Sequence, residues 1–153
     1  MATRSLTVES VQADGACAEG VAWLKEHEHL EPAALAKALL AKNPDWWAWA
    51  ANKGYDVIRP LTAADVSKVA RRAPWAAAVF LANRLSAGDI SEVARRDPWA
   101  AAEFLAARLS ADDVSKVARR DPWSAAKCLA GRLTAADRAV IIAARPDLAG
   151  VLT

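Results

Sequence analysis

The amino-acid sequence predicts an all-α fold, a right-handed α-solenoid of five helix-turn-helix repeats with an N-terminal helical cap. Composition gives the first indication, since Ala supplies 39 of the 153 residues and only six are Gly, a balance that favours helices over strands. Apolar residues make up 54% of the chain and charged residues 25%, which excludes a disordered chain. The strongest indication is an internal repeat of the length that is typical of solenoids.

The cap is predicted over residues 1–29. Two short helices are expected at residues 7–13 and 16–27, broken at Asp14-Gly15. Apolar side chains of the cap would cover the open end of the stack, and three tryptophans would lie where the cap meets the array. These residues are Val8, Val11, Val21, Trp23 and Leu24, together with Trp46, Trp47 and Trp49.

A motif of 15 residues recurs three times at intervals of 24 residues. Its copies read LTAADVSKVARRAPW from Leu61, LSAGDISEVARRDPW from Leu85 and LSADDVSKVARRDPW from Leu109. A fourth copy keeps Pro146 in register and then diverges, and a weaker copy lies upstream. We therefore place one helical-repeat array at residues 30–153, with repeats that start at residues 30, 61, 85, 109 and 133, and expect one domain in all.

Each copy carries the signals of two short helices. A hydroxyl residue lies three positions before an Asp, as Ser86 does before Asp89, which is a capping-box pattern with Asp in place of Glu or Gln. An apolar stripe with the spacing of one helix face follows, and an Arg pair ends the helix. Asp-Pro or Ala-Pro then begins a second helix, which is predicted to end at Arg84, Arg108 and Arg132 in successive copies.

The last copy departs from this pattern. Arg138 stands where the three preceding copies have Val or Ile, and the chain then runs into Asp147-Leu-Ala-Gly-Val-Leu. A terminal repeat needs a polar outer side because no further repeat covers it. We therefore expect the last copy to cap the array with one side facing water.

The two-helix copies resemble short α-solenoid families such as the HEAT-like and leucine-rich-variant repeats. Residues 61–70 also resemble the first helix of TAL-effector-like DNA-binding repeats, but Arg-Arg-Ala-Pro-Trp or Arg-Arg-Asp-Pro-Trp replaces their Gly-containing base-reading loop, so no residue is carried over as a base reader. Residues 15–25, followed by Asp45-Trp-Trp-Ala-Trp, resemble small accessory proteins of phages and mobile elements. That resemblance implies a non-enzymatic factor that binds a host defence or transcription component.

Basic residues recur at fixed places in the copies and are the main candidates for partner binding. Stacking of the copies would turn them into ladders that contact phosphates or an acidic protein surface. The arginines also lie at helix C-termini, where cations bond the last carbonyl groups, so a purely structural role is the alternative. The candidate partner-binding residues are Lys68, Arg71, Arg72, Arg84, Arg95, Arg96, Arg108, Lys116, Arg119, Arg120, Lys127 and Arg132.

Tryptophan also recurs once per copy, directly after the first proline of the second helix, at Trp75, Trp99 and Trp123. We expect these side chains to pack between copies, and partial exposure as interface anchors is the alternative. Beside them lies a strip of positions that differ between copies, which is either plain solvent surface or a specific contact strip. It includes Val79, Glu103 and Lys127, and Asn83, Ala107 and Gly131.

The sequence gives little support for catalysis or metal binding. It has no nucleophile–His–acid arrangement, no Gly-rich phosphate loop and no CxxC motif. His27 and His29 would point to opposite sides of a helix and cannot chelate one ion together. Cys17 and Cys128 make no disulfide framework and fit a reducing cytosol. We therefore expect no enzymatic activity, no cofactor and no metal.

The leading functional hypothesis is a cytoplasmic, non-enzymatic protein-binding module. It would be a phage- or mobile-element-encoded inhibitor of a host defence complex, such as an anti-CRISPR protein, that acts by steric occupancy. A nucleic-acid-binding solenoid is the first alternative, permitted by a net charge of +2, and a homo-oligomer joined through its Trp-rich N-terminal end is the second. No membrane partner is expected, since the longest uncharged stretch of the repeats, residues 73–83, is about half a membrane span, and the N-terminus has no signal-peptide core.

Overall fold

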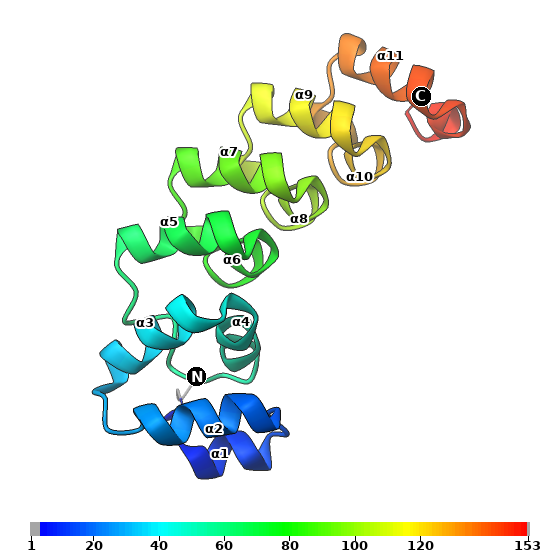
Figure 1. The fold of residues 1–153 in the computed structure, drawn as a ribbon. Coiled ribbons are helices and arrows are strands. Elements are labelled where there is room, and N and C mark those ends of the chain that lie inside the picture. The colour runs from blue at the N-terminus through cyan, green and yellow to red at the C-terminus, as the bar shows by residue number, and fades with distance from the viewer. Residues whose placement is uncertain (1–3, 153) are drawn as a thin grey trace. The chain divides into compact units, whose positions relative to one another are not determined.

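The computed structural model describes residues 4–152, which form helices joined by short turns (Figure 1). Within that range there is no strand, and a single β-bridge joins Arg4 to Tyr55. None of the helices in the described range is long and apolar enough to cross a membrane. The chain divides into two compact units, one that ends at Val69 and one that begins at Ala70. The predicted all-α class is confirmed, and consecutive helices pack against each other as in a helical repeat.

The first unit contains four complete helices among its described residues: α1 (Val8–Ala13), α2 (Ala18–His27), α3 (Pro32–Lys42) and α4 (Pro44–Asn52). The start of α5 (Ala63–Arg72) also belongs to it. Helices α1 and α2 confirm the two predicted for the cap, although α2 begins two residues late because Cys17 is its N-cap. The break between them needs Gly15, whose φ of +80° lies in the left-handed region that favours glycine.

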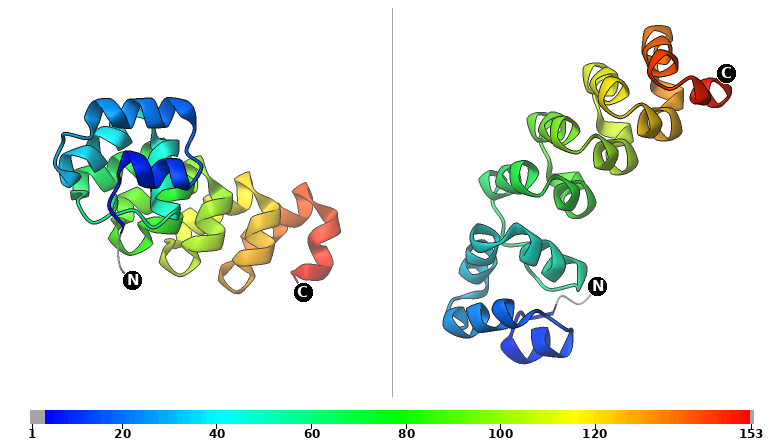
Figure 2. Two further views of the ribbon diagram at one scale, coloured as in Figure 1. Left: turned by 90° about the horizontal axis from the view of Figure 1, so that it is seen from below. Right: turned by 45° about the vertical axis from the view of Figure 1, so that its right-hand side comes forward.

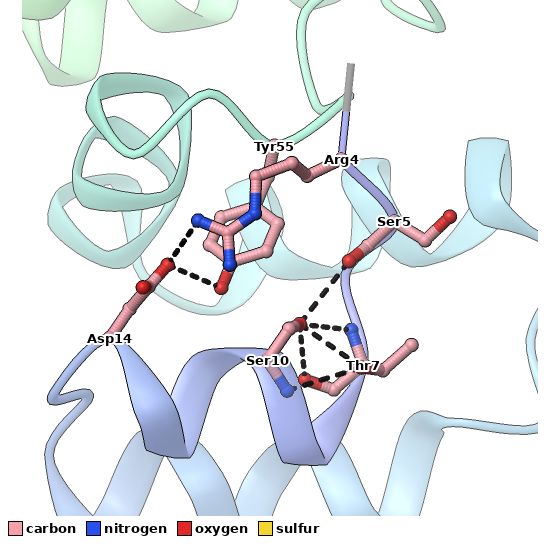
Figure 3. A network of polar contacts seen from close by, with 6 residues as sticks. All are labelled: Arg4, Ser5, Thr7, Ser10, Asp14 and Tyr55. Atoms are coloured by element: carbon pink, nitrogen blue, oxygen red, sulfur yellow. Dashed lines mark hydrogen bonds and ion pairs between the residues drawn. The ribbon is translucent and has the colours of Figure 1, made fainter. Parts of the chain in front are cut away.

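A polar network ties the N-terminal segment to the loop after α4 (Figure 3). The Arg4 guanidinium donates to Asp14 Oδ2 at 2.7 Å and lies 4.9 Å from the centre of the Tyr55 ring. The Tyr55 hydroxyl donates to the same carboxylate oxygen at 2.7 Å. Because these hydrogen bonds stabilise the ionised form, the pKa of Asp14 is lowered, first by Tyr55 and then by Arg4. Residues 4, 14 and 55 are thus held together although they are far apart in the sequence.

The second unit is a stack of helix pairs in two layers. One layer contains α7 (Ala87–Arg96), α9 (Ala111–Arg120) and α11 (Ala135–Ala144), and the other contains α6 (Pro74–Phe80), α8 (Pro98–Phe104) and α10 (Pro122–Cys128). Each helix contacts its equivalent in the next copy, one period of 24 residues along the chain (Figures 1 and 2). The sequence repeat is therefore a structural repeat in this unit.

The predicted helix starts are confirmed in this unit. The hydroxyl groups of Ser86, Ser110 and Thr134 accept from the backbone N–H three residues on, at 3.1 to 3.2 Å. At the second helix of two copies, the carboxylates of Asp97 and Asp121 cap the chain and accept from Ala100 N and Ser124 N. These bonds satisfy amide groups that a helix start leaves without partners.

The second helix of each copy is shorter than predicted. We expected it to end at Arg84, Arg108 and Arg132, but α6, α8 and α10 end at Phe80, Phe104 and Cys128. Leu81, Leu105 and Leu129 then leave the helical conformation, with φ near −118° in each case. Separate 3-10 helices follow at Ala82–Arg84, Ala106–Arg108 and Ala130–Arg132. The reason is packing, since the three leucines are 1% exposed and this turn also buries the leucine that opens the next copy.

Small side chains fill the centre of the stack. Ala100, Ala101 and Ala102 of α8 are fully buried, as are Val93 and Ala94 of α7. Alanine lets helix axes approach closely, which matches the thin layers of a 24-residue repeat. Leu81, Leu105 and Leu129 at the 3-10 turns are among the largest fully buried side chains, so the same position is buried in three successive copies.

Candidate partner-binding surface

The turn between the two helices of a copy carries two arginines before it and one tryptophan after it. In the second unit this pattern occurs three times, and all nine side chains are exposed. We call this surface the turn ridge. It consists of Arg71, Arg72 and Trp75, then Arg95, Arg96 and Trp99, then Arg119, Arg120 and Trp123.

The tryptophans of the turn ridge are less buried than we expected. Trp75, Trp99 and Trp123 are 42%, 40% and 42% exposed, so the alternative of partial exposure is the correct one. The three positions after each Trp explain this, because Ala or Ser side chains there occupy the buried face of the helix. The Trp, directly after the first proline, is left on the outer side.

Each exposed tryptophan contacts a side chain about one helical turn further along. The Trp75 and Trp99 rings meet Phe80 and Phe104 edge to face, with ring centres 6.0 and 5.7 Å apart. In the third copy, Lys127 places its ammonium group 4.6 Å from the centre of the Trp123 ring. These contacts fix the orientation of the rings while leaving a large part of each in water. Sequence reasoning missed the contribution of Phe104, which is itself 41% exposed.

The middle copy neutralises its own arginines. Arg95 donates to both oxygens of Glu92 at 2.7 and 2.8 Å, and Arg96 donates to Glu92 Oε1 at 2.5 Å. The hydrogen bonds from Arg95 and Arg96 lower the pKa of Glu92 to about 2. The neighbouring copies have Lys68 and Lys116 at this position. The row of basic groups is therefore interrupted by a carboxylate in its middle.

The two lysines at that position pair with acidic side chains of their own helices. Lys116 Nζ lies 2.6 Å from Asp112 Oδ2, and the hydrogen bond to Asp112 raises the pKa of Lys116. Lys68, which belongs to the first unit, lies 3.7 Å from Asp65 Oδ1. Both side chains remain about half exposed. Such pairs one helical turn apart are weak, so each lysine can exchange its aspartate for another acidic group.

A second set of candidate arginines is engaged within the stack. Arg108 donates to the backbone carbonyl of Ala82 in the preceding copy and, at 2.8 Å, to that of Leu85, which opens its own copy. Arg132 repeats this arrangement one copy later, with Ala106 and, at 2.6 Å, Leu109. The planar guanidinium group suits two acceptors at once. Arg84 occupies the equivalent position of its copy and is exposed.

The variable strip lies beside the tryptophans and is occupied differently in each copy. Val79 is half-buried, whereas Glu103 and Lys127 are exposed. The Cys128 thiol donates to Glu103 Oε2 at 3.2 Å across neighbouring copies. Burial and this hydrogen bond raise the pKa of Cys128, which makes its thiol less reactive. The strip therefore offers an apolar, an acidic and a basic group in succession along the stack.

Comparison with known proteins adds no assignment for this surface. The chain matches no known family model, no curated protein and no solved structure.

Proposed function

We propose that the chain is a non-enzymatic protein-binding module that contacts its partner through the turn ridge. The observation that supports this is the exposure of Trp75, Trp99 and Trp123, each 40 to 42% accessible and each beside an Arg pair. Tryptophan and arginine are the residue types that most often dominate the energy of protein interfaces. Successive copies place them about 8–10 Å apart, a spacing that suits a partner with several adjacent contact points.

The charges along the turn ridge indicate what chemical groups the surface of the partner would present. It would offer apolar recesses for the tryptophans and carboxylates for Arg71, Arg119 and Arg120. Opposite the middle copy, where Glu92 already binds Arg95 and Arg96, a carboxylate would gain little. A protein surface can carry such a mixed pattern, whereas a nucleic acid presents phosphates at regular intervals. The interruption by Glu92 and the engagement of Arg108 and Arg132 favour the protein partner.

The resemblance of the N-terminal segment to phage and mobile-element accessory proteins refines this proposal. In that setting the partner is a component of a larger host assembly, and the module blocks it by occupying its surface. No catalytic group or cofactor is needed for such a mechanism.

Quantitative affinity capture from host lysate with three forms of the chain tests the proposal. The forms are the wild type, a ridge variant in which Trp75, Trp99 and Trp123 are replaced by Ala, and a control variant. The control carries Ala at three exposed apolar residues outside the turn ridge, Val140, Ile142 and Val151. Unfolding by urea establishes that all three forms are folded, and light scattering measures self-association.

We expect the wild type and the control to retain the same partner and the ridge variant to lose it by at least about 30-fold, since a single interface Trp contributes about 2 kcal/mol or more. Equal retention by all three forms contradicts the proposal. So does duplex DNA or RNA binding that falls by about 10³-fold or more between 50 and 200 mM salt, which would indicate a phosphate-binding surface.

A further inference from the structure

The first unit contains a pocket that the proposed protein-binding surface does not use. Its volume is about 300 Å³, at the lower end for small-molecule sites. It is lined by residues between positions 6 and 24, a segment that includes α1 and most of α2, and by residues of α3 and α4. Aliphatic and aromatic groups form most of its surface. Its aromatic residues are Trp23, Trp46 and Trp49.

The walls of the pocket are fixed by the contacts described for this unit. Leu6, Val11 and Gly15 belong to the segment that the Arg4–Asp14–Tyr55 network holds in place (Figure 3). The same segment is braced by Thr7 and Ser10, which form a reciprocal capping box at the start of α1. The pocket is therefore formed by ordered elements of the fold, as a preformed binding site requires.

Gly20 and the Trp46 ring both line the pocket. A Cβ added at Gly20 would lie 3.3 Å from Cys17 Sγ and 3.8 Å from two ring atoms of Trp46. Glycine inside a helix costs about 1 kcal/mol relative to alanine, and here the close contact that a Cβ would make is with Cys17 Sγ, whereas its distance to the indole is that of ordinary packing. The indole of Trp46 and the thiol of Cys17 border the same space.

The charged groups at the pocket indicate which ligand it suits. Among the described residues that line the pocket, Asp45 is the only one with an acidic or basic side chain besides the Cys17 thiol. It lies on α4 beside Trp46 and four residues before Trp49. Lys53 Nζ lies 5.9 Å from the centre of the Trp49 ring, which leaves Trp23 and Trp46 as the rings for a ligand. Aromatic faces together with a carboxylate attract organic cations and disfavour anions.

We propose that this pocket binds a small organic ammonium ion with an apolar or aromatic body. The body would fill the space between Trp23 and Trp46, and the ammonium group would lie at Asp45 against the indole faces. This inference does not depend on the turn ridge, because every lining residue belongs to the first unit.

Three probes of nearly equal size and different charge test the inference on the full chain. 2-Phenylethylamine is a cation at neutral pH, 2-phenylethanol is neutral and phenylacetate is an anion. Isothermal titration measures their dissociation constants on the wild type, on Asp45→Asn and on the control Glu31→Gln. Glu31 is an exposed carboxylate at the start of α3 that makes no side-chain capping bond and does not line the pocket.

We expect the amine to bind about ten times more tightly than the alcohol, since a cation gains both the indole faces and the carboxylate, and the anion to bind least. Asp45→Asn should reduce the preference for the amine to less than threefold, whereas Glu31→Gln should retain it. Equal affinities for amine and alcohol on the wild type, or no binding of the amine at millimolar concentration, overturn the inference.

Alkylation of the two cysteines locates the bound probe. Cys17 is exposed and lines the pocket, whereas Cys128 belongs to the second unit and serves as the internal reference. Iodoacetamide labelling followed by peptide mass spectrometry gives both rates in one sample. We expect the amine to slow alkylation of Cys17 severalfold and to leave Cys128 unchanged. Amine binding that leaves the Cys17 rate unchanged would place the ligand elsewhere and overturn the inference.

Discussion

Asp113 shows how a single buried carboxylate joins two copies of the repeat. It is 2% exposed and accepts hydrogen bonds from the Ser110 hydroxyl at 2.7 Å and the Ser91 hydroxyl at 3.0 Å. Ser110 belongs to the same copy and Ser91 to the preceding one. A buried charge is tolerated only where such donors surround it. The capping box, predicted as a local feature, therefore also connects copies.

Replacing Asp113 by Ala should lower the free energy of unfolding by about 2–3 kcal/mol, because the two hydroxyl groups and the Ser110 amide lose a charged acceptor. The adjacent Asp112 gives a matched control, since its side chain is 72% exposed and pairs with Lys116 across one helical turn. Asp112→Ala should cost about 0.5 kcal/mol or less. Urea unfolding of both variants measures the difference, and equal losses would contradict the role given to Asp113.

Arg108 provides a second test at the residue scale. Its guanidinium group binds the carbonyls of Ala82 and Leu85 at the junction with the preceding copy, and a lysine can keep the charge but cannot reach both acceptors in that geometry. Arg108→Lys should destabilise the fold by about 1 kcal/mol. Arg120→Lys, at an exposed position of the turn ridge, should change stability by less than about 0.5 kcal/mol. A shift of the urea midpoint of the same size in both variants would show that the two carbonyl bonds contribute nothing.

At the scale of the element, helix starts were predictable from the sequence and helix ends were not. Ser86 with Asp89, and Asp97 with Pro98, are local signals whose chemistry acts within four residues. The end of α8 at Phe104 has no such signal, because Ala and Leu on either side all favour helix. Burial of Leu105 against the rest of the stack ends the helix there. The end of α8 is therefore set by tertiary packing, which local helix propensity does not predict.

The capping carboxylates predict how the helices respond to acid. The pKa of Asp65 is lowered, chiefly by hydrogen bonds from Thr62. Burial raises the pKa of Asp137, but hydrogen bonds from Thr134 and Ser115 outweigh it and the pKa is lowered overall. A carboxylate with a lower pKa in the folded state stabilises the fold above its unfolded pKa, near 4, and loses that contribution as the pH falls.

We therefore expect the urea midpoint to be constant between pH 7 and 5 and to fall as the pH drops below about 4. Asp137→Asn should be less stable than the wild type at pH 7 and should approach it at pH 3. Urea titrations at a series of pH values measure both trends. A stability that rises on acidification, or a variant whose deficit is the same at both pH values, would contradict this assignment.

At the scale of the whole molecule, the period of the sequence predicted the repeated copies but not which of their side chains are free to bind. Arg108 and Arg132 lie in the predicted ladders, yet their acceptors are 23 and 26 residues away in the chain. No local pattern identifies such partners. Burial statistics favoured packed tryptophans, whereas the small residues after each Trp in fact fill the core.

Arg138 takes a different role from the Val or Ile at its position in the three preceding copies. We predicted it to lie on a side that faces water, but it is half-buried. Its guanidinium group donates to the carbonyl of Ala130 at 3.1 Å and to that of Leu152, so it ties the end of the described chain to the preceding 3-10 turn. Val140 and Ile142 on the same helix are 40% and 37% exposed.

The proposed binding surface requires that Trp75, Trp99 and Trp123 be exposed to solvent, and ¹⁹F NMR of protein labelled with 5-fluorotryptophan tests this most directly. Single Trp→Phe variants assign the seven signals, and a soluble gadolinium chelate broadens those that water reaches. We expect strong broadening for Trp75, Trp99 and Trp123 and almost none for Trp47, which is fully buried. Three ridge signals as protected as that of Trp47 would show that these side chains pack between copies, and the proposed binding surface would not exist.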